Sequence, residues 1–123
     1  MEWREFTTEE YPELLDGNIG CCVFKSWGVY VKMLLDSFEW DREQSPEMSG
    51  LRVKQIKEKF GSLRVYCDVS TLSDVDKARV FAKIEMIDAI CSSTCIKCGS
   101  HEDVLNTTKQ DGGWLSPRCP LHR

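Results

Sequence analysis

The sequence has no long apolar run. No stretch approaches the roughly 20 apolar residues that a membrane-spanning helix needs, so we expect no membrane partner. The N-terminal residues are acidic and lack the apolar stretch of a signal peptide, which predicts a cytoplasmic protein in a reducing compartment. Internal repeats and low-complexity tracts are absent from the 123 residues, which excludes solenoid architectures.

Catalytic motifs are scarce as well. The chain has no His-Glu-x-x-His, no Gly-rich phosphate loop and no recognisable Ser-His-Asp set, and it has only two histidines, His101 and His122. These motifs supply the bases, nucleophiles and phosphate cradles of many enzymes. We therefore expect a protein that is not an enzyme.

Cysteine, in contrast, is abundant. Seven is an odd number, so the cysteines cannot all pair in internal disulfides, and reduced cysteines serve as core thiols, nucleophiles or metal ligands. Cys95 and Cys98 form a Cys-x2-Cys-Gly motif, and twenty residues separate it from a Cys-x2-His motif formed by Cys119 and His122. Two close pairs at this separation are typical of structural zinc sites.

The spacing predicts one structural Zn²⁺ in a tetrahedral site formed by Cys95, Cys98, Cys119 and His122. Residues 99–118 are expected to form a hairpin, with Asp111-Gly112-Gly113 as its turn and Trp114-Leu115 on its return strand. A redox disulfide between Cys95 and Cys98 is an alternative, but it leaves the second pair without a role. Either Cys91 or His101 is close enough in sequence to replace a ligand.

Hydrophobic periodicity predicts two main helices and a hairpin. Residues 26–40 place Trp27, Val31, Leu34, Leu35 and Phe38 on one helix face, with Ser26 as a candidate cap. Residues 73–91 are expected to form a second helix that begins at Ser73, and residues 8–15 are expected to form a short helix that ends at Gly17. Residues 51–68 read as a β-hairpin with its turn at residues 60–62 and a bulge near Gln55.

These elements predict an α+β fold, in which a small antiparallel sheet, the hairpin 51–68, packs on two helices. We expect residues 1–93 to form the α+β core. Residues 94–123 are expected to form a C-terminal zinc-knuckle hairpin that packs on the same domain.

Charge is divided unevenly along the chain. Residues 1–50 contain eleven acidic and four basic residues, whereas residues 51–123 contain nine acidic and twelve basic residues. The basic residues of the hairpin are concentrated within thirteen positions and comprise Arg52, Lys54, Lys57, Lys59 and Arg64. An overall charge of −4 makes a basic protein partner more favourable than nucleic acid, because phosphate contacts dominate nucleic-acid affinity.

Residues 53–66, with the sequence VKQIKEKFGSLRVY, resemble a hairpin motif of small, mostly uncharacterised bacterial and phage proteins. In those proteins a helix, a Cys-x2-Cys-Gly, a Gly-Trp and a final Cys-x2-His follow in the order seen here. Ser62 and Val65 depart from the pattern, which often has Gly and Phe at these positions. The resemblance implies a zinc-stabilised α+β domain, and its phage setting suggests a role in conflict between phages and bacteria.

Three functions are compatible with these features. The first is a protein inhibitor, either an immunity protein or a phage-encoded inhibitor, which binds a toxin or host enzyme with a basic surface. Its candidate contacts are the aromatic and acidic residues Trp3, Phe6, Tyr11, Glu39, Trp40, Asp41 and Glu43. The second is a nucleic-acid-binding zinc module, in which the five basic hairpin residues contact phosphates and Phe60 or Tyr66 stacks on a base. The third is a zinc-dependent enzyme.

Overall fold

A computed structural model of the chain describes residues 2–109 and 112–123. Six strands, two α-helices and two short 3-10 helices follow one another in this part of the chain. In chain order they are β1 (Trp3–Glu5), β2 (Gly20–Phe24), η1 (Lys25–Trp27), α1 (Gly28–Gln44), η2 (Pro46–Met48), β3 (Arg52–Lys59), β4 (Ser62–Asp68), α2 (Asp74–Ser92), β5 (Leu105–Thr107) and β6 (Ser116–Arg118).

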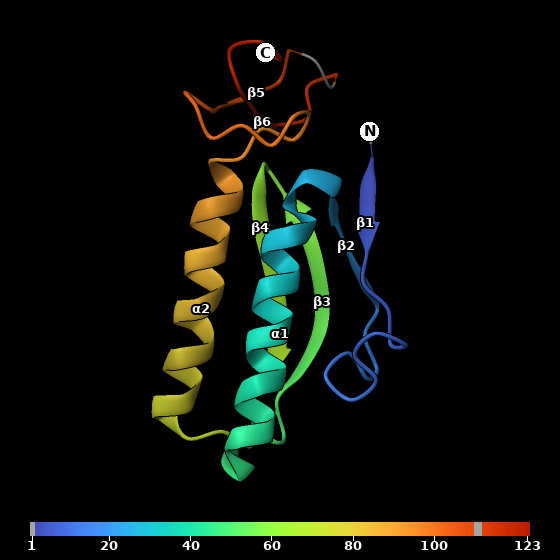
Figure 1. Cartoon of the computed structure of the whole chain (residues 1–123), viewed down its shortest axis with the longest axis vertical. Coiled ribbons are helices and arrows are strands. Elements are labelled where there is room, and N and C mark those ends of the chain that lie inside the picture. The colour runs from blue at the N-terminus through green and yellow to red at the C-terminus, as the bar shows by residue number, and fades with distance from the viewer. Residues whose placement is uncertain (1, 110–111) are drawn as a thin grey trace.

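The first four strands form one sheet in the order β1-β2-β3-β4, and α1 and α2 lie side by side on one of its faces (Figure 1). This arrangement confirms the α+β class. The sheet is larger than the predicted hairpin and is mixed, because β2 pairs with β3 in parallel. A parallel pair needs a crossover connection, which α1 provides here. Strands β1 and β2 are short, and apolar and polar residues alternate little along them, so the sequence pattern did not predict them.

The β3–β4 hairpin agrees with the prediction. Its strands pair antiparallel with a register shift between Val53 and Gln55, where a bulge was expected. Phe60 and Gly61 form the turn, and both have positive φ angles, 56° and 77°. A Cβ atom at position 61 would lie 2.2 Å from Oδ1 of Asn106, and the positive φ of this residue also favours glycine where the turn meets β5.

Both predicted helices are present, but α1 begins and ends later than predicted. The five apolar residues predicted to line one face of α1 are all buried, with Trp27 just before its first residue. The helix begins at Gly28 and continues to Gln44, four residues beyond the predicted end at residue 40, and Ser26 is not its cap. The second helix begins as predicted, because Ser73 Oγ accepts a hydrogen bond from the Asp76 amide at 3.1 Å.

The short helix expected at residues 8–15 does not form. This segment consists of turns, and Pro12 has no amide hydrogen to continue a helix. Its backbone pairs with the neighbouring strand instead, since the Val53 amide donates to the Leu14 carbonyl at 2.7 Å. The segment thus closes one end of the core, with Tyr11, Leu14 and Leu15 buried.

The core lies between the sheet and the two helices. Its largest fully buried side chains include Trp27, Phe6, Phe24, Phe38 and Met48. None of the helices in the described ranges has the length and apolar character needed to cross a bilayer.

Asp88 on α2 connects this helix to the start of β4. Its carboxylate accepts hydrogen bonds from the Leu63 amide at 2.8 Å and from the hydroxyls of Ser62 and Ser92 at 3.0 and 3.2 Å. One side chain therefore satisfies three donors at the packing contact between α2 and the hairpin.

Replacing Asp88 with alanine should lower the free energy of unfolding by about 1–3 kcal/mol, because these donors lose their acceptor in a partly buried place. Urea unfolding of Asp88→Ala measures the change, with Glu85→Ala on the exposed side of the same helix as the control. Equal stability of the two variants would contradict this role for Asp88.

Candidate metal centre

The four residues predicted as ligands converge at one end of the molecule. One ligand atom from each of Cys95, Cys98, Cys119 and His122 lies within 4.8 Å of all the others. Cys95 and Cys98 follow the C-terminus of α2, and Cys119 and His122 follow β6, so the cluster joins α2 to the end of the chain (Figure 1). This arrangement can hold one metal ion.

Three distances within the cluster are close to those of a tetrahedral site. Sγ of Cys98 lies 3.7 Å from Sγ of Cys119, and Nδ1 of His122 lies 3.2 Å from Sγ of Cys119 and 3.7 Å from Sγ of Cys95. Metal–sulfur bonds of about 2.3 Å place two sulfur atoms of a tetrahedron about 3.8 Å apart. Nδ1 is therefore the histidine nitrogen that is positioned to bind a metal ion.

Tight turns bring each pair of ligands together. In the first turn the Gly99 amide donates to the Cys95 carbonyl at 2.9 Å, and Gly99 has a φ of 78°, which favours glycine. In the second turn the His122 amide donates to the Cys119 carbonyl at 3.0 Å. Two residues between ligands are enough for each pair to point toward one ion.

A two-stranded sheet connects the pairs, as the sequence predicted, but its return strand is displaced. β6 comprises Ser116–Arg118 and pairs antiparallel with β5, whereas Trp114 and Leu115 precede it. The expected turn includes Asp111, which lies outside the described residues. The Ile96 amide donates to the Pro117 carbonyl at 2.9 Å, which places β6 beside the first ligand pair.

Neither alternative ligand belongs to the cluster. Cys91 is fully buried in the main core. His101 lies in a separate polar contact, with Nε2 2.7 Å from the Tyr30 hydroxyl and Nδ1 3.2 Å from the Ser93 carbonyl. His101 therefore helps to join the C-terminal segment to α1.

Arg118 is a residue at this centre that the sequence analysis missed. It is buried, and it donates from Nη1 to the His122 carbonyl at 3.1 Å and from Nε to Ser116 Oγ at 3.1 Å. It thereby fixes the backbone that carries the last ligand. Its position next to Cys119 was the only sequence signal, and no spacing rule distinguishes it from a surface arginine.

Local electrostatics favour a thiolate at the first ligand. Burial of Cys95 opposes ionisation, but the backbone amides of Cys119, Cys98 and Lys97 and the Cys119 thiol together lower the pKa of Cys95 to about 6. A thiolate is the form of cysteine that binds metals. A negative charge at Cys95 would favour the binding of a cation at this cluster.

The predicted partner contacts need correction. Phe6 and Tyr11 are 2% and 5% exposed in the core, and Asp41 is 8% exposed and pairs with Lys83 at 2.5 Å. These three residues are not accessible to a partner, because Phe6 and Tyr11 pack in the core and Asp41 forms an ion pair between the two helices. Trp3, Glu39, Trp40 and Glu43 keep accessible area on the surface.

The predicted phosphate contacts lie along the hairpin. Lys59 and Arg64 are exposed, and Arg52, Lys54 and Lys57 are partly exposed. Arg52 is engaged by the Ser49 and Leu51 carbonyls.

Comparison of the chain with protein-family models, with curated proteins and with solved structures found no match. Functional proposals for this chain therefore depend on its own sequence and structure.

In metal-free, reduced protein, a thiolate should form near pH 6, well below the ordinary cysteine pKa of 9. Folding lowers the pKa of Cys95, so the Cys95 thiolate stabilises the folded state. This stabilisation is fully present above pH 9 and is lost as the pH falls through about 6. Ultraviolet thiolate absorbance measures the titration, which Cys95→Ser should remove. Cys67→Ser should leave it, since burial raises the pKa of Cys67 to about 12. A titration that begins only near pH 9 would contradict the prediction.

Proposed function

We propose that the cluster holds one structural Zn²⁺ and that the protein acts by binding rather than by catalysis. Three sulfur donors and one imidazole nitrogen form a ligand set typical of zinc. The observation that carries this proposal is that the ligand atoms of four residues lie within 4.8 Å of one another, with Sγ of Cys98 and Sγ of Cys119 3.7 Å apart. Four such ligands complete the coordination of zinc, whereas a catalytic site keeps one position open.

Purified, reduced protein should contain one zinc ion per chain, as measured by elemental analysis. Cys119→Ser should reduce the zinc content, and a chelator should lower the thermal midpoint, because metal binding stabilises only the folded chain. Cys22→Ser, which changes a cysteine outside the cluster, should alter neither property. A different bound metal would contradict the assignment of zinc, and a protein without metal would contradict the site itself.

We further propose that this zinc-stabilised module inhibits a protein partner by covering a basic surface, as an immunity protein or a phage-encoded inhibitor does. The support comes from the C-terminal half of α1. Trp40 is 62% exposed there, with Asp36 one turn before it and Glu43 one turn after it on the same helix. Exposed tryptophans that are surrounded by charge are frequent anchors of protein interfaces.

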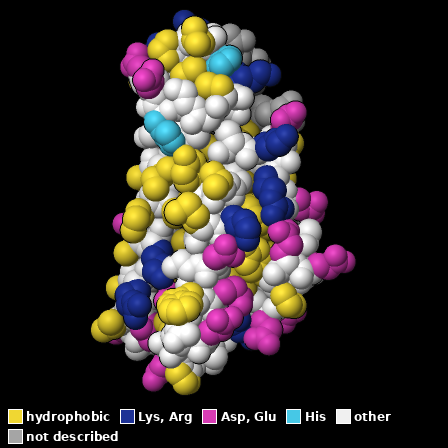
Figure 2. Space-filling model, viewed as in Figure 1, with side chains coloured by type: hydrophobic (Ala, Val, Ile, Leu, Met, Phe, Trp, Pro, Cys, Tyr) yellow, Lys and Arg dark blue, Asp and Glu magenta, His cyan; other side chains and the backbone are white. Residues whose placement is uncertain are grey.

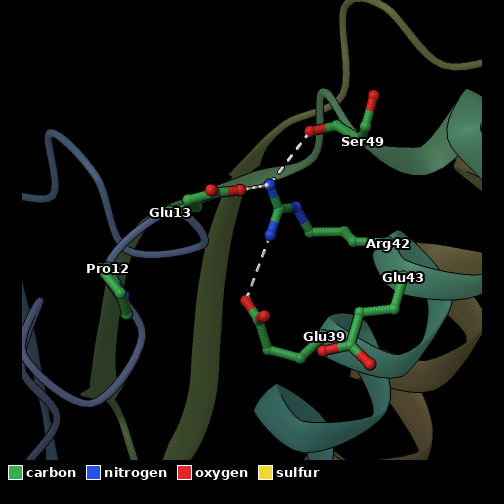
Figure 3. A pocket seen from close by; sticks show the side chains of 6 residues that line it. All are labelled: Pro12, Glu13, Glu39, Arg42, Glu43 and Ser49. Carbon is green, nitrogen blue, oxygen red and sulfur yellow. Dashed lines mark hydrogen bonds and ion pairs between the residues drawn. The ribbon is translucent and has the colours of Figure 1, made fainter.

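A shallow pocket beside this part of α1 adds to the acidic character of the surface (Figure 3). Three carboxylates, those of Glu13, Glu39 and Glu43, surround the single guanidinium of Arg42. Arg42 donates to Glu13 at 2.8 Å and to Glu39 at 3.3 Å, while Glu43 has no ion-pair partner among the described residues. Negative charge therefore exceeds positive charge, as a basic partner surface requires.

Figure 2 shows acidic side chains gathered around the lower right of the molecule, where α1 and the segment before β2 lie. The acidic surface therefore lies far from the metal cluster at the other end. We expect zinc to act on partner binding only through the stability of the fold.

Trp40→Ala and Glu43→Lys should each weaken partner binding at least about tenfold, because one removes an aromatic anchor and the other introduces repulsion. The protein is immobilised and exposed to lysate of the cells that encode it, and captured proteins are identified and tested for inhibition. Glu85→Lys on α2 is the matched charge control and should retain the partner. Capture that both α1 variants leave unchanged, or a partner whose activity is not inhibited, would contradict the proposal.

A further inference from the structure

A second surface lies where the tip of the β3–β4 hairpin meets the C-terminal hairpin. A pocket there is lined by Glu58, Lys59, Phe60, Thr108, Gly113, Trp114 and Leu115. Its lining is mainly apolar, and it includes two aromatic side chains that remain accessible: Phe60 is 64% exposed and Trp114 is 47% exposed. Large aromatic side chains seldom remain accessible around one pocket without a partner.

The backbone at Phe60 is unfavourable for this residue type. Its φ of 56° lies in the left-handed region, which bulky residues rarely adopt and which glycine adopts at no cost. The side chain of Asn106 in β5 lies close to Gly61, so the turn lies beside β5. The strained conformation therefore places an aromatic ring at the pocket, and such strain is concentrated at ligand-binding sites.

Glu58 contributes a polar group without a partner. Its Oε2 atom is buried and accepts no hydrogen bond within the described ranges. A buried carboxylate oxygen without a donor is unfavourable, so a rotation of the Glu58 side chain that turns this oxygen into the pocket would favour a ligand with N–H groups. Amino groups of nucleobases are such donors, and carboxylates accept from them in known complexes.

Positive charge continues from the pocket onto the uncovered face of the sheet. Lys57 and Arg64 are directly opposite each other in the ladder, next to the inward-facing pair Ile56 and Val65, so they point away from the helices. Like charges opposite each other are destabilising. None of Lys57, Lys59 and Arg64 has an ion-pair partner in the part of the chain that the structure describes.

We propose that this surface binds single-stranded nucleic acid, with one base held in the pocket between Phe60 and Trp114 and the phosphates along Lys59, Lys57 and Arg64. Aromatic rings beside unpaired cations are the combination that binds single strands, because bases stack while phosphates pair with the cations. Glu58 accepts from the amino group of the bound base. Thymine would bind less well, since two carbonyl oxygens flank its single N–H.

The test is fluorescence anisotropy of zinc-loaded, full-length protein with labelled oligo(dC) and oligo(dT) of about twelve nucleotides, within the usual range of site sizes. We expect salt-dependent binding that favours oligo(dC). Phe60→Gly should reduce affinity about tenfold, as expected for the loss of one stacking contact, and should raise the thermal midpoint because glycine suits the turn. This combination separates a binding role from a folding defect.

Lys57→Gln combined with Arg64→Gln should reduce the slope of log affinity against log salt by about 1.4, or about 0.7 for each phosphate contact. Lys77→Gln on α2 is the matched charge control and should leave the slope unchanged. Glu58→Gln should narrow the preference for oligo(dC), because an amide can both donate and accept.

Three results would overturn the proposal. The first is the absence of binding at low salt, and the second is binding that Phe60→Gly leaves unchanged. The third is equally tight binding of poly-glutamate, which has charges but no bases and would show a general anion surface.

Discussion

The convergence of Cys95, Cys98, Cys119 and His122 is the constraint on which the C-terminal segment depends. Leu105, Trp114 and Leu121 of this segment are exposed and Ile96 packs against the main core, so the segment has little hydrophobic core of its own. A short segment without a core needs another source of stability, and a tetrahedral metal site is one. The neighbouring contacts of Arg118 and His101 orient the segment and do not replace such a site.

The main core does not share this dependence. Two helices cover one face of the four-stranded sheet, and the aromatic cluster around Trp27 and Phe24 lies between the layers. Trp27 also connects the two parts, because its indole nitrogen donates to the carbonyl of Thr94, the residue before the first ligand, at 3.5 Å. If the cluster holds a metal ion, its removal is expected to lower the stability of the C-terminal hairpin more than that of the sheet and helices.

Ion pairs within the N-terminal half reduce the amount of unpaired negative charge on its surface. Many acidic residues of the N-terminal half are already paired, as in the contacts of Glu10 with Arg4 and of Asp36 with Lys32. The basic residues at the hairpin tip are not paired in this way within the described residues. The net charge of −4 therefore describes neither surface well, since the acidic region around Trp40 and the cations around Lys57 lie on different elements.

The features that depend on local spacing could be predicted from the sequence. The ligand pairs, the Ser73 cap, the β3–β4 turn and the buried stripe of α1 follow from turns and helical periodicity, which act over a few residues. Tertiary structure alone decided which aromatic and acidic residues remain accessible, so Phe6, Tyr11 and Asp41 are internal and Trp40 is not. The parallel pairing of β2 with β3 and the presence of Phe60 and Trp114 around one pocket also depend on tertiary structure, because they involve segments that are distant in the chain.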